Sequence, residues 1–207
     1  TLMYDRVKKA HIKGINILPD EESERKMYYL TNNILRSNGY RKYEISNYSK
    51  PGKECKHNIG YWQRKEYLGF GIGAASLYKE NRYNNISDIN KYIEVLTNNI
   101  KENSINNVGN SSEVENQVNI LNSIVKNLQQ LTERDRMEEF MFLGLRMMEG
   151  VSMEKFERYF GKPYMEIYGK VQKKMEDKRF LINDNGYVKL TEFGIDLSNY
   201  VMSEFLF

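Results

Sequence analysis

Apolar residues recur at helical spacing near the start of the chain. Between Asp20 and Asn38 they fall three and four residues apart, which places Met27, Leu30 and Ile34 on one face of an α-helix. Asp20 can accept hydrogen bonds from the first-turn amides, and Asn38-Gly39 allows the chain to leave the helix in a left-handed conformation. The pattern therefore predicts a helix that begins after Asp20 and ends at Asn38.

The spacing then changes to the period of a β-strand. Between residues 40 and 47, Tyr43 and Ile45 alternate with polar residues, which predicts a strand that enters a sheet directly after the helix. Lys50-Pro51-Gly52 breaks regular structure, so the next stretch should begin on a loop at the C-terminal end of that strand. Folds of the α/β class usually place their chemistry at such a position.

Three further segments follow before residue 131. Residues 67–78 are predicted to be extended, and Asp88 to about Glu102 is predicted to form an amphipathic helix. Ten of the 33 residues from Asn98 to Gln130 are asparagine, which indicates a flexible insertion between domains. A helix is an alternative prediction for part of this segment, because five of its apolar residues keep a helical spacing. The helix from Asp88 should bury Ile89, Tyr92, Ile93, Leu96 and Ile100, and the five spaced residues are Val118, Leu121, Ile124, Val125 and Leu128.

The last 76 residues carry clear helix and turn signals. Thr132 and Ser152 are predicted N-caps, Gly161 ends the second helix, and Pro163 opens a third. Asn185-Gly186 between two apolar runs predicts a hairpin, and Thr191 starts a final helix. The order helix, helix, helix, hairpin, helix is typical of a winged helix. The residues predicted to face inward are Met137, Phe140, Met141, Met148, Phe156, Phe160, Tyr164, Ile167, Tyr168, Val171 and Met175.

Composition limits the class of protein. With 40% hydrophobic residues, the 207-residue chain can fill a core. No apolar stretch approaches the roughly 18 residues of a membrane helix, and no signal segment opens the chain, so we expect a cytoplasmic protein without a transmembrane segment. The single cysteine, Cys55, is expected to be a reduced, unligated thiol. The chain begins at Thr1 within an amphipathic pattern of residues, so we expect it to be a fragment of a longer protein.

The winged-helix order raises the alternative of nucleic-acid binding. The net charge is only +3, and residues 132–207 hold 12 Lys and Arg against 14 Asp and Glu. Proteins that bind DNA draw most of their affinity from neutralising phosphates, so an acidic excess in this domain is unfavourable. We therefore expect no nucleic-acid partner.

Residues 55–78 concentrate the unusual side chains: the only cysteine, the only tryptophan and one of two histidines, beside alternating glycines. Gly69, Gly71 and Gly73 are spaced two and two, whereas the dinucleotide-binding fingerprint has its third glycine three positions on and a helix there. Glycines at period two on a strand leave one face without side chains. Either a flat ligand or another backbone segment can then approach closely.

His57 is the candidate metal ligand, because a largely neutral imidazole can bind iron. Tyr61 and Trp62 offer flat apolar faces with polar tips, which suits a planar amphiphilic ligand, and Asn58 can hold a turn open. Cys55 can act as a second soft ligand. The alternative is a surface or capping histidine, which is how we interpret the other histidine, His11.

Five stretches together resemble the C-terminal half of the HemN/HemW family of radical S-adenosylmethionine proteins. This family is related to oxygen-independent coproporphyrinogen III oxidase. The resemblance implies the C-terminal end of a partial (β/α) barrel over residues 1–90, a helix and insertion over 91–131, and a winged-helix-like, mostly helical domain over 132–207. The fold class expected is thus α/β followed by α+β. The stretches are residues 43–48, 50–52, 55–62, 67–74 and 138–146.

The motif His-Asn-x-x-Tyr-Trp resembles the haem-chaperone branch, whereas true oxidases carry a sequence of the type Arg-Asn-Phe-Gln-Gly-Tyr. The resemblance implies that four residues help to hold haem, with the histidine as the iron ligand. It also implies that the glycine-rich segment lies on the side of S-adenosylmethionine, although many relatives have histidine where this chain has Ala75. The haem residues are His57, Asn58, Tyr61 and Trp62, and those near S-adenosylmethionine are Gly71, Gly73 and Ala75.

The family's cluster motif, Cys-x-x-x-Cys-x-x-Cys, does not occur in this sequence. We therefore expect the [4Fe–4S] cluster and S-adenosylmethionine to belong to a longer parent protein, and this chain alone to lack catalysis. The parent is expected to bind haem and transfer it to an acceptor protein that the sequence does not identify. The alternatives are decarboxylation of coproporphyrinogen III and, in a different class, nucleic-acid binding.

Overall fold

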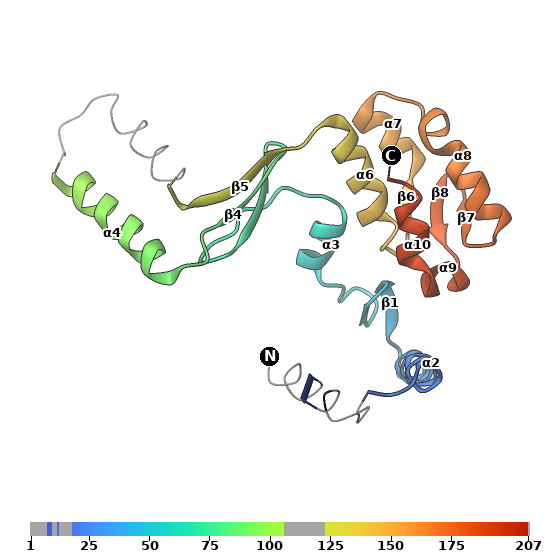
Figure 1. The fold of residues 1–207 in the computed structure, drawn as a ribbon. Coiled ribbons are helices and arrows are strands. Elements are labelled where there is room, and N and C mark those ends of the chain that lie inside the picture. Colours follow the sequence, from blue (N-terminus) through green and yellow to red (C-terminus); the bar gives the residue numbers. More distant parts are fainter. Residues whose placement is uncertain (1–7, 10–11, 13–17, 106–122, 207) are drawn as a thin grey trace. The chain divides into compact units, whose positions relative to one another are not determined.

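The computed structural model describes residues 8–9, 12, 18–105 and 123–206, and the side chains of residues 99–105 are not included in that description. The described part of the predicted insertion therefore excludes Val118 and Leu121. Contacts divide the chain into two compact units, Thr1–Cys55 and Lys56–Phe207, each of which is described by itself. Figure 1 gives the labels of the helices and strands.

Residues 18–55 of the first unit form a helix and a hairpin. Helix α2 (Glu21–Ser37) begins where the sequence predicts, because Asp20 accepts a hydrogen bond from the amide of Ser23 at 2.7 Å. It ends at Asn38, as predicted, and Gly39 follows with a φ of 80°. The apolar side chains Met27, Leu30 and Ile34 remain 50–59% exposed.

The single strand predicted over residues 40–47 is wrong. The chain forms two short antiparallel strands instead, β1 (Arg41–Glu44) and β2 (Asn47–Ser49). The carboxylate of Glu44 is fully buried and accepts hydrogen bonds from the amide of Ser46 and the side chain of Asn47, at 3.0 and 2.6 Å. These local bonds close a tight turn between β1 and β2. The alternation of apolar and polar residues does not reveal this turn, so the segment was predicted as one continuous strand.

The second unit begins with α3 (Lys56–Trp62) and a three-stranded antiparallel sheet. The sheet has the order β3-β4-β5, and α4 (Ile89–Ile105) lies between β4 and β5 in the sequence. Helix α4 was predicted and begins after Asp88, whose carboxylate accepts from two first-turn amides. The strands are β3 (Ala75–Tyr78), β4 (Asn81–Asn85) and β5 (Val125–Gln130).

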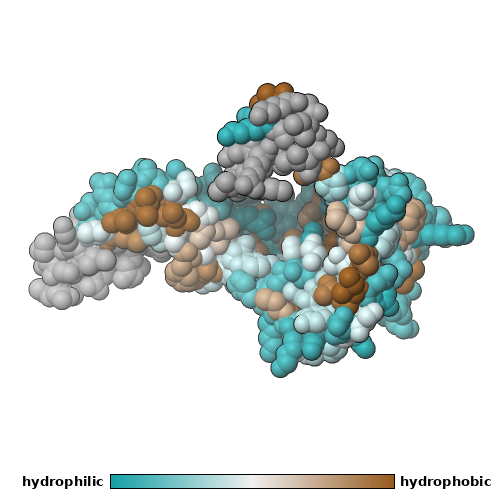
Figure 2. Space-filling model, turned by 90° about the horizontal axis from the view of Figure 1, so that it is seen from below, coloured by the Kyte–Doolittle hydropathy of each residue, from teal (hydrophilic) through white to brown (hydrophobic). Residues whose placement is uncertain are grey.

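Two predictions, one for this sheet and one for helix α4, are wrong. Residues 125–130 were assigned to a flexible insertion with a helix as the alternative, but they pair with β4 from Asn85↔Val125 to Asn81↔Gln130. The predicted apolar face of α4 is only partly covered by described residues, since Ile89 and Ile93 are each 54% exposed. Figure 2 shows uncovered hydrophobic surface in brown near the left of the view.

The C-terminal region agrees closely with its predicted order. Ser152 caps α7, Gly161 ends it at a φ of 65°, and α8 follows Pro163. Asn185 and Gly186 both have positive φ in the predicted hairpin. The elements are α6 (Glu133–Gly144), β6 (Val151–Ser152), α7 (Met153–Phe160), α8 (Tyr164–Asp177), β7 (Leu181–Asp184), β8 (Tyr187–Leu190), α9 (Glu192–Asp196) and α10 (Ser198–Ser203).

Two details were not predicted. Strand β6 joins the hairpin to give a sheet of order β6-β8-β7, and the final helix is two short helices. Most residues predicted to face inward are buried; Phe140, Met148, Ile167 and Val171 are half-buried instead. The core gathers Met137, Met141, Phe156, Tyr164, Tyr168, Met175, Leu181, Val188, Val201, Met202 and Phe205. Within residues 18–105 and 123–206, no helix is both long and apolar enough to cross a membrane.

Helix α6 carries a capping box that gives the first testable prediction. The Thr132 hydroxyl accepts from the Asp135 amide at 3.1 Å, and the Asp135 carboxylate accepts from the Thr132 amide at 2.8 Å. Thr132→Ala should lower the free energy of unfolding by about 1 kcal/mol, because the cap hydroxyl is lost. Thr132→Ser keeps the hydroxyl and should stay close to the wild type. Urea unfolding checks both, and equal losses in the two variants would contradict a role for the hydroxyl.

Candidate functional site

The motif His-Asn-x-x-Tyr-Trp lies on α3, a seven-residue helix, and not on a loop as predicted. A helix this short shows no amphipathic repeat in the sequence, and the turn residues just before it suggested a longer loop. The helix sets residues four positions apart over one another. His57 therefore meets Tyr61, with ring centroids 4.7 Å apart, and the Trp62 indole N–H donates to the Asn58 side-chain oxygen at 3.0 Å.

His57 and Tyr61 form an open aromatic row. The Tyr61 ring contacts Tyr67 edge-on at 4.6 Å, and Tyr67 exchanges backbone hydrogen bonds with Leu77 of β3 at 2.8 and 3.0 Å. The His57 side chain is exposed, and in residues 18–105 and 123–206 neither of its ring nitrogens has a hydrogen-bond partner. The imidazole is therefore exposed to solvent at the N-terminal end of α3.

Trp62 faces the other way, toward the C-terminal helices. The guanidinium of Arg146 lies 4.3 Å from its ring centroid, a cation–π contact. Trp62 also lines a cavity of about 220 Å³ together with Phe140 of α6, Val151 of β6 and Met147, which lies between these two elements. Drug-sized ligand pockets usually measure about 300–1,000 Å³, so this cavity does not enclose a macrocycle. His57 is not part of its lining.

The glycine-rich segment is a loop rather than the predicted strand. Gly71 and Gly73 have φ values of 92° and 66°, which an extended strand does not contain. A Cβ atom at Gly69 would lie 2.2 Å from the carbonyl oxygen of Ala75, so close backbone packing explains this glycine. At Gly71 and Gly73 nothing described lies within 4 Å of that position, which leaves their backbone open, and Ala75 is exposed.

Asn85 and Ser76 hold this loop in place, and neither was singled out from the sequence. The buried Asn85 side chain donates to the carbonyls of Gly69 and Gly71 at 3.1 and 2.8 Å. The Ser76 hydroxyl accepts from the Gly69 amide at 2.9 Å. An asparagine among many asparagines carries no distinguishing signal, so only the strand pairing of β3 with β4 reveals its role.

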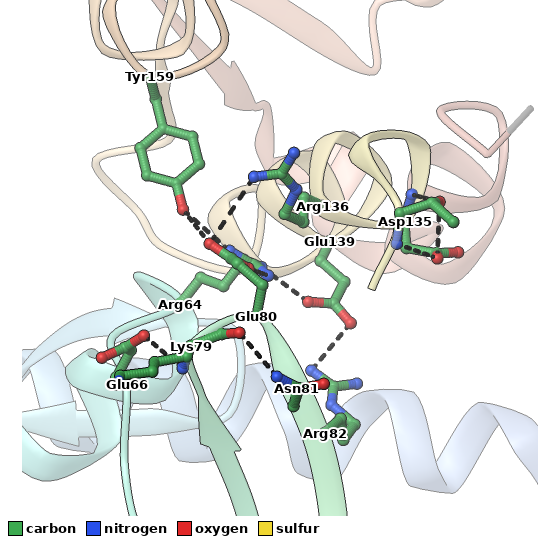
Figure 3. Close-up of polar contacts among 11 residues, drawn as sticks. Arg64, Glu66, Lys79, Glu80, Asn81, Arg82, Asp135, Arg136, Glu139 and Tyr159 are labelled. Carbon is green, nitrogen blue, oxygen red and sulfur yellow. Dashed lines mark hydrogen bonds and ion pairs between the residues drawn. The ribbon is translucent and has the colours of Figure 1, made fainter. Parts of the chain in front are cut away.

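A buried ionic network joins the end of α3 to the C-terminal helices (Figure 3). The Arg64 side chain is only 5% exposed; it pairs with Glu80 in the turn between β3 and β4, and with Glu139 of α6 at 2.8 Å. Tyr159 of α7 accepts from Arg64 at 3.2 Å and donates to Glu80 at 2.7 Å. Arg82 also pairs with Glu139, at 2.9 Å. Sequence reasoning missed this network, because its members lie up to 95 positions apart.

The network shifts the pKa values of Arg64 and Glu80. Burial alone would lower the pKa of Arg64, but the hydrogen bonds to Glu80 and Glu139 outweigh it and raise that pKa. Partial burial alone would raise the pKa of Glu80, but the hydrogen bonds from Arg64 and Tyr159 lower it below its ordinary value. Both groups are thus held in their charged forms.

The described residues contain no cluster of three or more His, Cys, Asp or Glu side chains placed to hold a metal ion. Cys55 is exposed and forms no disulfide. A [4Fe–4S] cluster of the radical type needs three thiolates, so the single cysteine of this sequence does not fit that group.

Comparison with known proteins decides the family. Residues 131–197 match the HemN C-terminal domain. Heme chaperone HemW of Lactococcus lactis is 34% identical over 194 residues, which are 94% of this chain and 45% of that protein. Heme chaperone HemW of Bacillus subtilis is 29% identical over 206 residues, 100% of this chain and 48% of that protein.

The chain belongs to the HemN/HemW family. The resemblance that its motifs indicated is thereby confirmed, and the chain spans about half the length of the curated relatives it matches. The solved structure of coproporphyrinogen III oxidase (HemN) from Escherichia coli, a radical SAM enzyme, has a TM-score of 0.64. It covers 91% of this chain and 42% of the oxidase at 14% identity, so it shows a shared fold. The predicted mixture of helices and sheet is confirmed, and the described residues form no closed barrel.

Asn85 gives a prediction for the HemN/HemW glycine loop. Asn85→Asp has almost the same shape but replaces the donor to Gly69 and Gly71 with a carboxylate that faces two carbonyl oxygens. The variant should lose about 1–3 kcal/mol of unfolding free energy and expose the amides of residues 69–73 to hydrogen exchange. Asn84→Asp, on the neighbouring half-buried residue, serves as the control. Equal protection of these amides from hydrogen exchange in the two variants would contradict the role of Asn85 in holding the loop.

The ionic network makes stability depend on acid pH. Because the pKa of Glu80 lies below its ordinary value of 4.5 in the fold, the unfolded chain binds this proton more tightly. Its contribution is complete above the ordinary pKa of 4.5 and is lost as the pH falls from that value through the lowered pKa of the folded state, which defines the window. Urea unfolding should show that the gap between wild type and Glu80→Gln narrows across this window. Glu22→Gln, in an exposed pair with Lys26, should run parallel to the wild type; a constant gap for Glu80→Gln would contradict the prediction.

Proposed function

We propose that the protein binds haem as a cargo and passes it to an acceptor protein, in the cytoplasm. The names of its relatives from Lactococcus lactis and Bacillus subtilis support this function. The observation that carries the proposal for this chain is the exposed imidazole of His57, which lies edge-on against Tyr61 and has no hydrogen-bond partner among the described residues.

The four motif residues divide into two roles in this proposal. His57 is the axial ligand of the haem iron, and Tyr61 supplies an aromatic contact beside it. Asn58 and Trp62 help to hold the haem indirectly, because they bond to each other and Trp62 stacks on Arg146. The porphyrin lies on the surface at α3, since the cavity beside Trp62 is too small for it.

The rest of the family arrangement is proposed in the same way. Residues 1–90 are the end of a partial radical SAM barrel, residues 91–131 a helix and insertion, and residues 132–207 a winged-helix-like domain. Gly71, Gly73 and Ala75 would lie beside S-adenosylmethionine, which the open backbone at both glycines and the exposure of Ala75 support. The cluster would be held by residues outside this sequence. The acidic excess in residues 132–207 supports the absence of a nucleic-acid partner.

Haem titration tests the proposal, with the protein expressed at the full length that its gene encodes. His57→Ala should shift the Soret band and weaken haem binding by about tenfold or more, because the iron loses its ligand. His11→Ala removes the other histidine of the sequence and is the matched control, which should titrate like the wild type. Equal spectra and affinities for His57→Ala and His11→Ala would remove His57 from the proposed role.

The alternative activity is oxidative decarboxylation of two propionates of coproporphyrinogen III, which the fold shared with HemN keeps open. Anaerobic incubation of the reconstituted protein with S-adenosylmethionine and coproporphyrinogen III separates the two functions. Product formation over many turnovers would favour the oxidase. Haem binding without turnover would favour the carrier.

A further inference from the structure

Helix α3 ends in a motif where glycine is the usual residue. The amide of Lys65 donates to the Gly60 carbonyl at 2.9 Å, and the amide of Arg64 donates to the Tyr61 carbonyl at 3.0 Å. This is the Schellman pattern, and Arg64 occupies its left-handed position with a φ of 55°. A side chain there meets a steric cost that glycine avoids. If Arg64 served only to end the helix, glycine would serve better.

The strained position points the Arg64 side chain into the buried network. Its guanidinium contacts three separate elements: Glu80 between β3 and β4, Glu139 on α6, and Tyr159 on α7 (Figure 3). Residues in such sparsely populated conformations persist where their surroundings fix them and are frequent at functional sites. The network is therefore the interaction that holds Arg64 in its conformation.

The position of Arg64 decides which part of α3 is fixed. Arg64 lies two residues beyond Trp62, which is itself stacked on Arg146, so the C-terminal end of the helix is tied twice to the segment from α6 to α7. The N-terminal end, with His57, is exposed. Seven residues extend about 10 Å, so a small rotation at the tied end moves the His57 ring by a larger distance.

We propose that Arg64 is a positioning residue, which sets the direction in which α3 presents His57 and Tyr61. Arg64 does not touch the ligand. It acts by tying the end of the helix to the β3–β4 turn, α6 and α7. The consequence for haem rests on the function proposed above, whereas the consequence for the helix does not.

Arg64→Gly is the decisive variant, because it keeps the left-handed backbone, relieves its strain and removes the network. Arg64→Lys retains one positive charge and should therefore keep part of the positioning that Arg64→Gly loses. Thr191→Ala, which loses the cap contacts to Gly194 and Arg179, is a control for general destabilisation. All variants are made in the protein at its encoded length and checked for folding by circular dichroism.

Trp62 is the only tryptophan of this sequence and lies on α3, so its fluorescence reports on the helix without any haem. The same measurements on Trp62→Phe isolate its signal. In Arg64→Gly, Trp62 emission should shift to the red and become easier to quench with acrylamide, and haem affinity should fall about tenfold. Arg64→Lys should lie between Arg64→Gly and the wild type, and Thr191→Ala should match the wild type in both measurements.

The two measurements separate the two proposals. Unchanged Trp62 emission and quenching in Arg64→Gly would overturn the positioning role, whatever the haem result. Changed Trp62 emission with unchanged haem affinity would overturn the link between helix direction and the ligand. If the wild type binds no haem, the proposed function fails, and the Trp62 measurement alone still decides whether Arg64 positions α3.

Discussion

A buried guanidinium, that of Arg64, links three elements of the second unit. Removing a charge from water is costly unless opposite charges and hydrogen bonds replace the solvent, and Arg64 is satisfied by Glu80, Glu139 and Tyr159 together. These partners come from a turn, from α6 and from α7, so a shift of any of these elements would remove one of the groups that satisfy the buried charge. Loss of one partner should therefore cost more than loss of an exposed ion pair such as Lys173–Asp177.

The helix that this network holds explains the spacing of its motif. His-Asn-x-x-Tyr-Trp is two overlapping pairs, each four residues apart, and the pairs lie on adjoining faces of the helix. One pair is internal, since Trp62 bonds Asn58 and stacks on Arg146. In the other pair, His57 is exposed, whereas Tyr61 is half-buried against Tyr67. The sequence suggested that all four motif residues hold one ligand. In the structure, Asn58 and Trp62 anchor the helix, and His57 is exposed.

The sequence allowed correct prediction of features whose causes are local. Thr132, Ser152 and Asn185-Gly186 act within about four residues, so their caps and turn follow from the chain itself. Strand β5 could not be predicted, because it depends on pairing between Asn85 and Val125, 40 positions apart. The glycine loop was wrongly predicted for a related reason. Its alternating glycines have the period of a strand, but Gly71 has a positive φ and its carbonyl accepts a hydrogen bond from Asn85, which lies on another strand. The candidate site was proposed from its motif, but Arg64 and its distant partners left no such signal.

Exposure of His57 bears on the kind of haem binding proposed for this protein. A resident cofactor is usually enclosed, because burial of the macrocycle slows its dissociation. A carrier must release its ligand to an acceptor, so a site with one protein ligand and an open side suits transfer better than a closed pocket. The rigid anchoring of α3 through Arg64 and Trp62 would then supply affinity by preorganisation, without enclosing the porphyrin. On this view, specificity for haem depends on the direction of one short helix more than on the shape of a cavity.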